Sequence, residues 1–471
     1  MDYTEQNVRK LVEEVIKSMN LTSTNVNNEK KLGVFSNLNN AVEASDIAFK
    51  EFSKISLEIR KKLIANIRKI SMEYNEILSK MAHEETGMGR WENKVLKNEL
   101  GINKTPGVED IVSEAFTDDH GLTLVERAPY GVIGAITPST NPVVTIICNA
   151  IGMLAAGNAV VFNPHPSAKK VSASLISLLN TAIIEAGGPV NLISCIDEPT
   201  IESAKELMCH KKIAIMVVTG GPAVVKAAMN SGKKVIAAGP GNPPVVVDET
   251  ANITKAAKDI VDGASFDNNV ICICEKEVIV VESVAAQLKE EMKKNGAYEL
   301  TDNQIKQITE LVISDPGGPG HEGAANKNFV GKNADFIAKG IGLNVPSSTR
   351  LLICEVDKNH PLVWTEQLMP VMPIVRVKDV DAAIDLAVDC EHGFRHTAMM
   401  YSLNIAKLSK MAKVMNCSIF IKNGPSYAGL GFGGAGFASF TIASPTGEGV
   451  TRARTFTRER RCTLVDYLRI I

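Results

Sequence analysis

The sequence predicts an α/β protein in which two parallel β-sheets follow one another along the chain, each covered by helices. From about residue 122, short and continuously apolar segments alternate with amphipathic helical segments, as expected for strands buried on both faces. A second alternation of the same kind begins near Ile253. Of the 471 residues 45% are hydrophobic and 22% are charged, which excludes a disordered or fibrous chain.

Charge and cysteine usage exclude several classes of function. The net charge is −2, from 51 basic and 53 acidic residues, which argues against nucleic-acid binding. The nine cysteines form no CxxC pairs, so we expect neither a disulfide framework nor a structural metal site, but reduced thiols in the cytoplasm. No apolar run approaches the ~20 residues of a membrane span.

The first 19 residues form an amphipathic helical pattern followed by a polar, Asn-rich stretch at 20–31 that predicts a linker. The stripe consists of Val8, Leu11, Val12, Val15, Ile16 and Met19. Such a helix needs a partner to cover it, which could be the body of the protein, a membrane or another protein. Because the stripe has no large aromatic residue and its polar face has mixed charge, a membrane is disfavoured. An ordinary first helix packed on the core is the simpler alternative.

The remaining elements follow in order. Residues 32–118 show helical spacing throughout, and 122–138 is strand-like with Pro129 and Gly131 interrupting it. Strands and helices then alternate from 142 to 248 and again from 253 to 422, and the tail at 455–468 returns to strand-like alternation. Between these last two regions lies a Gly-rich segment at 429–434, which matches GxGxxG but lacks a following helix, so it is not a dinucleotide fingerprint.

Several segments could contribute chemistry. Cys272 and Cys274 follow a polar loop and enter an expected strand, where they would share a face. A cysteine at such a junction can be a reactive thiolate, although a buried structural cysteine is the commoner case. Asn141, in a turn between two prolines, could donate to an oxyanion or simply satisfy its own turn.

Other segments suggest a nucleotide. His165 lies between prolines at the end of an apolar strand, where it could line a ligand. Thr219, Gly220 and Gly221 connect a strand to a helix, an arrangement that favours phosphate. Glu366 lies in a Pro- and Met-rich loop and could accept from ribose hydroxyls, or be a surface acid.

Taken in order, these stretches resemble the aldehyde dehydrogenase superfamily from about residue 33 to 471. The resemblance is carried by EETGMGRWENK, GLTLVERAPYGVIGAITPSTNP, AAGNAVVFNPHPSAKK, VVTGGPAVV, GASFDNNVICICEKEV, TEQLMPVMPIVRV, EHGFRHTA and SPTGEGVTRARTFTRERRC. More narrowly, the chain is similar to the coenzyme-A-acylating aldehyde dehydrogenases of bacterial microcompartments, which act on acetaldehyde or propionaldehyde.

The resemblance implies roles for individual residues. Cys272 matches the nucleophile and Asn141 the oxyanion donor, although Asn141 is shifted by one place from the asparagine of hydrolytic relatives. The cofactor would be NAD, with coenzyme A as co-substrate and no metal. The cofactor-binding residues implied are Thr137, Pro138, Ser139, Asn163, Pro164, His165, Thr219, Gly220, Gly221, Glu366 and Leu368. Asn163 stands where hydrolytic relatives have a lysine, which leaves no basic residue there for a 2′-phosphate and favours NAD over NADP.

One departure from the hydrolytic pattern is informative. Relatives that release a free acid carry a glutamate that activates water, and this chain has Ala237 there. A thioester on Cys272 would then persist until a thiol arrives, which favours transfer to coenzyme A. The open alternatives are an NAD(P)-dependent dehydrogenase releasing free acid, a catalytically idle shell-binding protein, and an acyltransferase without redox chemistry.

The resemblance also implies an organisation of the chain. Residues 1–19 would dock the enzyme to a microcompartment shell protein, inside the compartment in the cytoplasm, with 20–31 as linker. Residues 32–118 and 139–238 would form a Rossmann-like cofactor domain, and 239–430 the catalytic domain. Residues 119–138 and 431–471 would form a β arm for assembly into a homodimer or homotetramer.

Overall fold

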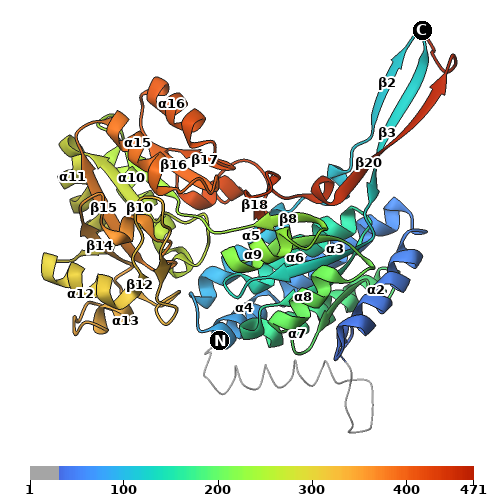
Figure 1. The fold of residues 1–471 in the computed structure, drawn as a ribbon, viewed down its shortest axis with the longest axis horizontal. Coiled ribbons are helices and arrows are strands. Elements are labelled where there is room, and N and C mark those ends of the chain that lie inside the picture. The colour runs from blue at the N-terminus through green and yellow to red at the C-terminus, as the bar shows by residue number, and fades with distance from the viewer. Residues whose placement is uncertain (1–30) are drawn as a thin grey trace, which may run out of the picture.

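The computed structural model describes residues 31–471, so the predicted helix at 1–19 and nearly all of the predicted linker lie outside the described residues. Figure 1 shows two α/β bodies side by side and a thin β arm that projects from one of them. The predicted fold class is confirmed: the two large sheets are parallel, and the small sheets are antiparallel.

The first body contains a parallel six-stranded sheet in the order β1-β6-β5-β4-β7-β8. Its strands are β1 Val34–Phe35, β4 Val132–Thr137, β5 Ala159–Pro164, β6 Ile193–Ile196, β7 Ile213–Thr219 and β8 Lys234–Ala238. The helices of this body are α2 Leu38–Phe52, α3 Leu57–Glu73, α4 Asn75–Thr86, α5 Trp91–Lys104, α6 Pro142–Ala155, α7 Lys169–Glu185, α8 Ile201–Cys209 and α9 Pro222–Met229. Every residue of α6 is buried, because this helix packs inside the body.

The second body contains a parallel seven-stranded sheet in the order β11-β14-β15-β10-β9-β16-β17. Its strands are β9 Pro244–Val247, β10 Glu277–Val281, β11 Ala297–Glu299, β14 Leu351–Glu355, β15 Val371–Val377, β16 Thr397–Tyr401 and β17 Ile419–Lys422. Its helices are α10 Ile253–Ser265, α11 Glu282–Lys294, α12 Asp302–Val312, α13 Ala334–Lys339, α14 Pro361–Trp364, α15 Val380–Cys390 and α16 Ile405–Met415. Short pairs β12 Ile313–Asp315 with β13 Ala324–Ala325, and β18 Ile442–Ala443 with β19 Gly449–Val450, complete the small sheets of both bodies.

The arm is an antiparallel sheet of β2 Glu114–Asp118, β3 Gly121–Pro129 and β20 Thr457–Val465, with β3 in the middle. The strand predicted in the C-terminal tail is thus confirmed as β20. The predicted range 119–138 of the arm is too long, since β4 lies inside the six-stranded sheet. At Gly131, where φ is 132°, the chain leaves the arm and enters the body, and the sequence pattern treated the two strands as one.

Two more expectations are corrected. The region 32–118 is not helical throughout, because β1 pairs with β6 and β2 pairs with β3. Cys272 and Cys274 do not enter a strand, since β10 begins only at Glu277. They lie in a turn, in which the amide of Cys274 donates to the carbonyl of Ile271.

The described part of the chain has no helix that is long and apolar enough to span a membrane. It also has no group of three His, Cys, Asp or Glu side chains that could hold a metal ion.

Candidate active site

The carboxyl ends of three neighbouring strands of the six-stranded sheet bring together residues implied for the cofactor. β5, β4 and β7 are adjacent and parallel, so Pro164, Thr137 and Thr219 end at the same edge. Ligands of open α/β sheets bind at this edge. The side chain of Thr137 is buried, and its hydroxyl has no hydrogen-bond partner among the described residues.

The turn at Thr219 to Gly221 leaves room for a ligand. A side chain at Gly221 would meet nothing within 4 Å, and α9 starts directly after it with Pro222. The hydroxyls of Thr219 and Thr441 are 2.9 Å apart, which fixes the start of the turn. An open glycine turn and an unpartnered hydroxyl are features that fit a dinucleotide at this edge.

Other residues implied for the cofactor have different surroundings. Pro138 and Ser139 are half-buried in the loop after β4, and His165 is exposed. The side-chain carbonyl of Asn163 accepts a 2.6 Å hydrogen bond from the hydroxyl of Ser203 on α8, and Asn163 is only 3% exposed. Asn163 therefore holds α8 against the sheet.

The turn that carries Cys272 has unusual backbone geometry. Asp267, Asn268 and Asn269 in the 3-10 helix Phe266–Asn269 have φ of 49°, 53° and 67°, in the left-handed region that non-glycine residues rarely adopt. Polar contacts hold this conformation, including two hydrogen bonds of 2.9 Å from the Asn269 amide nitrogen to the carbonyls of Ala264 and Glu275. Strain of this kind concentrates at functional sites. Cys272 is half-buried, whereas Cys274 is fully buried.

Gly241 allows the backbone of Cys272 and the ring of His396 to lie close on either side of it. A Cβ at Gly241 would lie 2.9 Å from the Cys272 carbonyl oxygen and 2.9 Å from Cγ of His396. The amide of Gly241 also donates to Glu366 Oε1 over 3.4 Å. Cys272, His396 and Glu366 therefore surround the backbone at Gly241. This glycine belongs to the segment in which hydrolytic relatives carry the water-activating glutamate, at the position of Ala237 here.

Burial sets the protonation of these groups. Burial, with a smaller contribution from the charge of Glu366 and against the attraction of Lys276, raises the pKa of Cys272 to about 12. Burial raises the pKa of Glu366 to about 7, against the attraction of Lys276. Burial likewise lowers the pKa of His396 to about 3, so its imidazole is neutral at pH 7, and Nε2 has no partner among the described residues. The resting thiol is thus protonated and needs a base.

Leu368 lies in the same loop as Glu366. It has φ of 52°, and its carbonyl accepts a 2.9 Å hydrogen bond from the amide of Gly331. The carbonyl of Gly331 in turn accepts a 2.8 Å hydrogen bond from the amide of Gly89, so the loop is linked to the segment just before α5.

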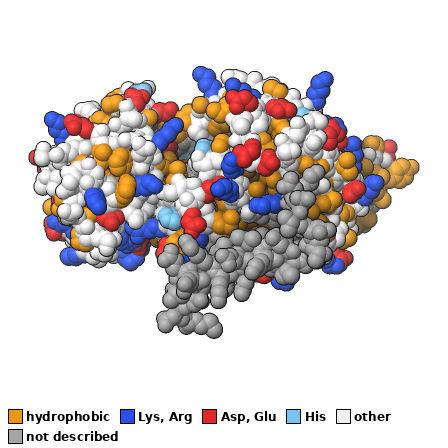
Figure 2. Space-filling view, turned by 90° about the horizontal axis from the view of Figure 1, so that it is seen from below, with side chains coloured by type: hydrophobic (Ala, Val, Ile, Leu, Met, Phe, Trp, Pro, Cys, Tyr) orange, Lys and Arg blue, Asp and Glu red, His pale blue; other side chains and the backbone are white. Residues whose placement is uncertain are grey.

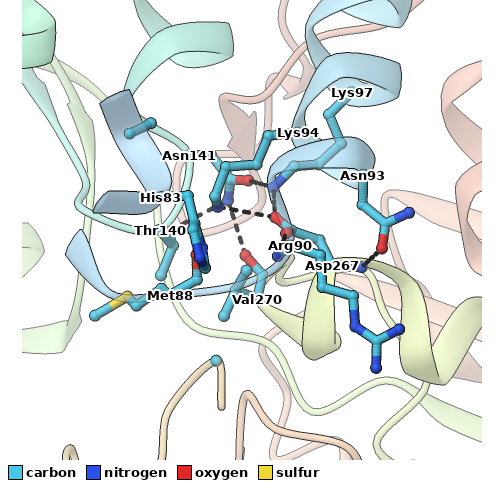
Figure 3. Close-up of polar contacts among 12 residues, drawn as sticks. His83, Met88, Arg90, Asn93, Lys94, Lys97, Thr140, Asn141, Asp267 and Val270 are labelled. Carbon is cyan, nitrogen blue, oxygen red and sulfur yellow. Dashed lines mark hydrogen bonds and ion pairs between the residues drawn. The ribbon is translucent and has the colours of Figure 1, made fainter. Parts of the chain in front are cut away.

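Asn141 lies immediately before α6 and is 8% exposed. Its amide nitrogen donates to the carbonyl of Val270 over 3.0 Å and to the hydroxyl of Thr140 over 3.2 Å, and its side-chain carbonyl accepts from Lys97 (Figure 3). The structure therefore brings Asn141 to the turn that carries Cys272, two residues before the thiol.

Sequence reasoning singled out Cys272, Asn141 and Glu366 but not His396, Lys97 or Lys276. His396 lay within a stretch that resembled the family, yet its only local signal is one histidine before a strand. The two lysines resemble ordinary surface charges in sequence, and only the fold shows that both are at most 2% exposed.

Known proteins place the chain in a family. The model of the aldehyde dehydrogenase family matches residues 12–448. An acetylating acetaldehyde dehydrogenase of Bilophila wadsworthia is 49% identical over the whole of both chains.

Solved structures agree. The propionaldehyde dehydrogenase of Rhodopseudomonas palustris, with bound CoA and an acylated cysteine, is 50% identical over 92% of this chain and 98% of that one, with a TM-score of 0.89. The propionaldehyde dehydrogenase of the fucose-utilisation microcompartment of Clostridium phytofermentans is 50% identical over 93% and 100%, with a TM-score of 0.90. An engineered glycolyl-CoA reductase with bound NADP⁺ has the same identity and TM-score over 93% and 99%.

The chain therefore belongs to the aldehyde dehydrogenase family, among its CoA-acylating acetaldehyde and propanal dehydrogenases.

Proposed function

We propose that the chain oxidises a short-chain aldehyde (propionaldehyde, acetaldehyde or lactaldehyde) with NAD⁺ and coenzyme A, giving acyl-CoA and NADH through a thioester on Cys272. The observation that carries the proposal is the arrangement around Gly241. There the backbone of Cys272, the neutral imidazole of His396 and the carboxyl group of Glu366 surround one glycine, and Ala237, which is fully buried, stands at the position of the water-activating glutamate.

The first step is addition of the Cys272 sulfur to the aldehyde carbonyl carbon. The thiol proton leaves to a base, and the carbonyl oxygen gains negative charge as the thiohemiacetal forms. Asn141 can exchange its longer hydrogen bond, to Thr140, for this oxygen while the bond to Val270 holds its nitrogen in place. Donors fixed before the reaction stabilise such an oxygen most effectively.

Two groups can take the thiol proton. Burial raises the pKa of Glu366 to about 7, which is closer to the working pH than that of an exposed carboxyl group. Glu366 contacts the amide of Gly241, the glycine that packs against the Cys272 backbone, and its charge raises the pKa of the thiol. His396 offers a ring nitrogen that has no hydrogen-bond partner within residues 31–471, and its low pKa makes it the weaker base.

A bound dinucleotide would supply the acceptor for the hydride that leaves the thiohemiacetal carbon. The residues that would hold it at the edge of the six-stranded sheet are Thr137, Pro138, Ser139, Pro164, His165, Thr219, Gly220 and Gly221. Glu366 and Leu368 would contact it from the second body. Glu366 as a carboxylate accepts hydrogen bonds from sugar hydroxyls. The choice of NAD over NADP rests on the absence of a basic residue at Asn163.

The thioester then waits for a nucleophile. The thiol of coenzyme A needs less activation than water, because some thiolate is present near neutral pH. It attacks the thioester carbonyl, the bond to Cys272 breaks, and the cysteine thiolate regains a proton. No carboxylate at Ala237 competes by activating water.

The test is NADH formation from propionaldehyde and NAD⁺ with and without coenzyme A, followed at 340 nm, with identification of the thioester product. We expect sustained turnover and propionyl-CoA only when coenzyme A is present. Equal turnover without it would instead identify a dehydrogenase that releases free acid. The absence of any absorbance change at 340 nm would indicate an acyltransferase without redox chemistry. If the Cys272→Ala variant behaved like wild type in every assay, the chain would be an idle shell-binding protein.

Assembly is the second part of the proposal. Residues 1–19 would dock to a microcompartment shell protein, an idea supported by their apolar stripe and by the microcompartment origin of the Clostridium structure. A reporter fused to residues 1–19 should sediment with shells, and a reporter that stays in solution would refute the idea.

The β arm would join copies of the chain into a homodimer or homotetramer. Figure 2 shows apolar side chains at the end of the molecule from which the arm projects. Phe116 and Val465 of the arm are 57% and 63% exposed, which is unusual for large apolar residues on a small sheet.

A further inference from the structure

A buried charge cluster lies beneath the turn that carries Cys272, and the reaction described above does not use it directly. Lys94 and Lys97 of α5 both contact the same carboxylate oxygen of Asp267, Lys94 at 3.1 Å. The side chains of Lys94, Lys97 and Asp267 are 4%, 2% and 0% exposed. Two ammonium groups therefore share one carboxylate away from water, an arrangement that is costly unless each charge is well partnered.

Asp267 itself is needed to fix the turn. Its other carboxylate oxygen accepts a 2.6 Å hydrogen bond from the amide of Arg90, and its own amide donates to Asn93 over 3.0 Å. One lysine would suffice to neutralise it. The second lysine therefore calls for another explanation.

The two lysines differ in one contact. Lys97 also donates to the side-chain carbonyl of Asn141, whereas Lys94 contacts only Asp267 among the described residues. In Figure 3 both lysines descend from α5, and Asn141 lies between Lys97 and Val270.

The contact with Lys97 determines which way the carboxamide of Asn141 faces. With its oxygen toward the ammonium, its nitrogen faces the Val270 carbonyl. The flipped amide would place N–H groups against the ammonium and oxygen against the carbonyl, so both contacts would be repulsive. The flip is therefore excluded by two interactions at once.

Direct contact between Lys97 and substrate is not supported. The cavity beside Lys94, Lys97, Thr140 and Asn141 measures only about 10 Å³, the space of about one water molecule. Any influence on the chemistry must therefore pass through Asn141 or through Asp267, and Lys94 shares only the contact with Asp267.

We infer that Lys97 is a positioning residue for the thioester chemistry, which orients the Asn141 carboxamide so that its nitrogen faces the turn carrying Cys272. The inference rests on the proposed function, because it assumes that the Cys272 thioester forms and that Asn141 stabilises its oxyanion. Burial lowers the pKa of Lys97 to about 8 although Asp267 opposes the shift, so the lysine remains mostly protonated at pH 7. A cation kept in place against this desolvation fits a role other than stability.

The test is a double-mutant cycle with a matched control. Lys97→Met and Asn141→Ala are made singly and together, and Lys94→Met, from the same helix and the same carboxylate, is combined with Asn141→Ala in parallel. The measurement is the rate of the first turnover of NADH formation from propionaldehyde. Loss of an oxyanion donor lowers such rates by about 10²-fold or more.

We expect Asn141→Ala and Lys97→Met each to lower the rate by about 10²-fold, and the double variant to be only slightly slower than either one. Lys94→Met should cause a smaller loss that multiplies with that of Asn141→Ala. Lys97→Gln, which keeps an uncharged donor, should recover part of the rate and also covers the case in which Lys97→Met does not fold.

A wild-type rate in both Lys97 variants, or losses from Lys97→Met and Asn141→Ala that multiply fully, would overturn the inference. The proposed function is tested separately by Cys272→Ala. If that variant still forms propionyl-CoA, the proposed function fails. If it is inactive while the Lys97 cycle is additive, only the role of Lys97 fails.

Discussion

The amide of Gly241 donates a 3.4 Å hydrogen bond to Glu366, and the same glycine leaves no room for a side chain between Cys272 and His396. β8 leads from the first body into this crossing segment, which enters β9 of the second body at Pro244. The candidate active site is thus assembled where the two bodies meet, around a crossing segment in which Gly241 has no side chain. The predictions below follow from that geometry.

Cys272→Ala should abolish formation of NADH and of acyl-CoA, because no other described thiol is half-buried at this turn. Cys274→Ala is the matched control two residues away, and its thiol lies wholly in the core of the second body. Its activity should stay within a few-fold of wild type. The measurement is absorbance at 340 nm, and equal losses in the two variants would argue against Cys272 as nucleophile.

Gly241→Ala should lower kcat strongly while the protein still folds. The added methyl group would lie 2.9 Å from both the Cys272 carbonyl oxygen and the His396 ring, so one of them must shift. Misplacement of about 1 Å can cost ~10²-fold in rate. Gly318→Ala, which meets nothing within 4 Å, is the control and should retain the wild-type kcat. A Gly241→Ala enzyme with unchanged kcat would refute the close approach.

Binding of NAD⁺ should strengthen as pH rises through about 7. Burial raises the pKa of Glu366 from 4.5 to about 7, so the carboxylate that accepts from ribose hydroxyls is lost below this pH. The KM for NAD⁺, measured between pH 6 and 8, should rise by up to about tenfold for each pH unit below 7. In Glu366→Gln that dependence should vanish, and its persistence would assign the effect to another group.

The same pKa makes a prediction about stability. Because the folded-state pKa of Glu366 lies above its unfolded value, the folded state binds more protons between pH 4.5 and 7. The contribution of Glu366 to the free energy of unfolding therefore falls as pH rises through this window. Glu366→Gln should flatten this part of the stability profile, measured by chemical denaturation at pH 5 and pH 7. An unchanged slope would contradict the raised pKa.

Val465→Asp should shift the protein toward smaller assemblies if the arm joins copies of the chain. A charge at this 63% exposed apolar position should leave the fold intact but would have to be desolvated in an interface. Light scattering of the variant beside Glu126→Gln, a change at an exposed position of β3, measures the effect. The same mass for both variants and wild type would count against an interface at this end of the arm.

The sequence allowed the α/β class and most strands to be predicted, because buried parallel strands leave apolar runs such as 132–137 and 213–219. The boundary between arm and body was misplaced because β3 and β4 form one continuous pattern, interrupted only by Pro129 and Gly131. The strand expected at Cys272 was wrong for a related reason. Apolar residues alternate in this segment as they do in a strand. However, Asn268 and Asn269 just before it adopt left-handed backbone conformations, which the spacing of apolar residues does not indicate.

Many contacts of the candidate site could be identified only from the folded structure. Cys272 and Glu366 were predicted through the resemblance to a family, and their roles remain predictions. The partners of Asn141 could not be inferred, since Lys97 is 44 residues away and Val270 is 129 residues away in the chain. The importance of His396 depends on Gly241, which is distant in sequence and adjacent only in the folded protein.

The most direct measurement of the central claim is intact-protein and peptide mass spectrometry after mixing the enzyme with propionaldehyde and NAD⁺ in the absence of coenzyme A. We predict the mass of one propionyl group on the peptide containing Cys272, and its complete transfer to coenzyme A when that thiol is added. An unmodified Cys272, or a propionyl group that coenzyme A does not remove, would contradict the account.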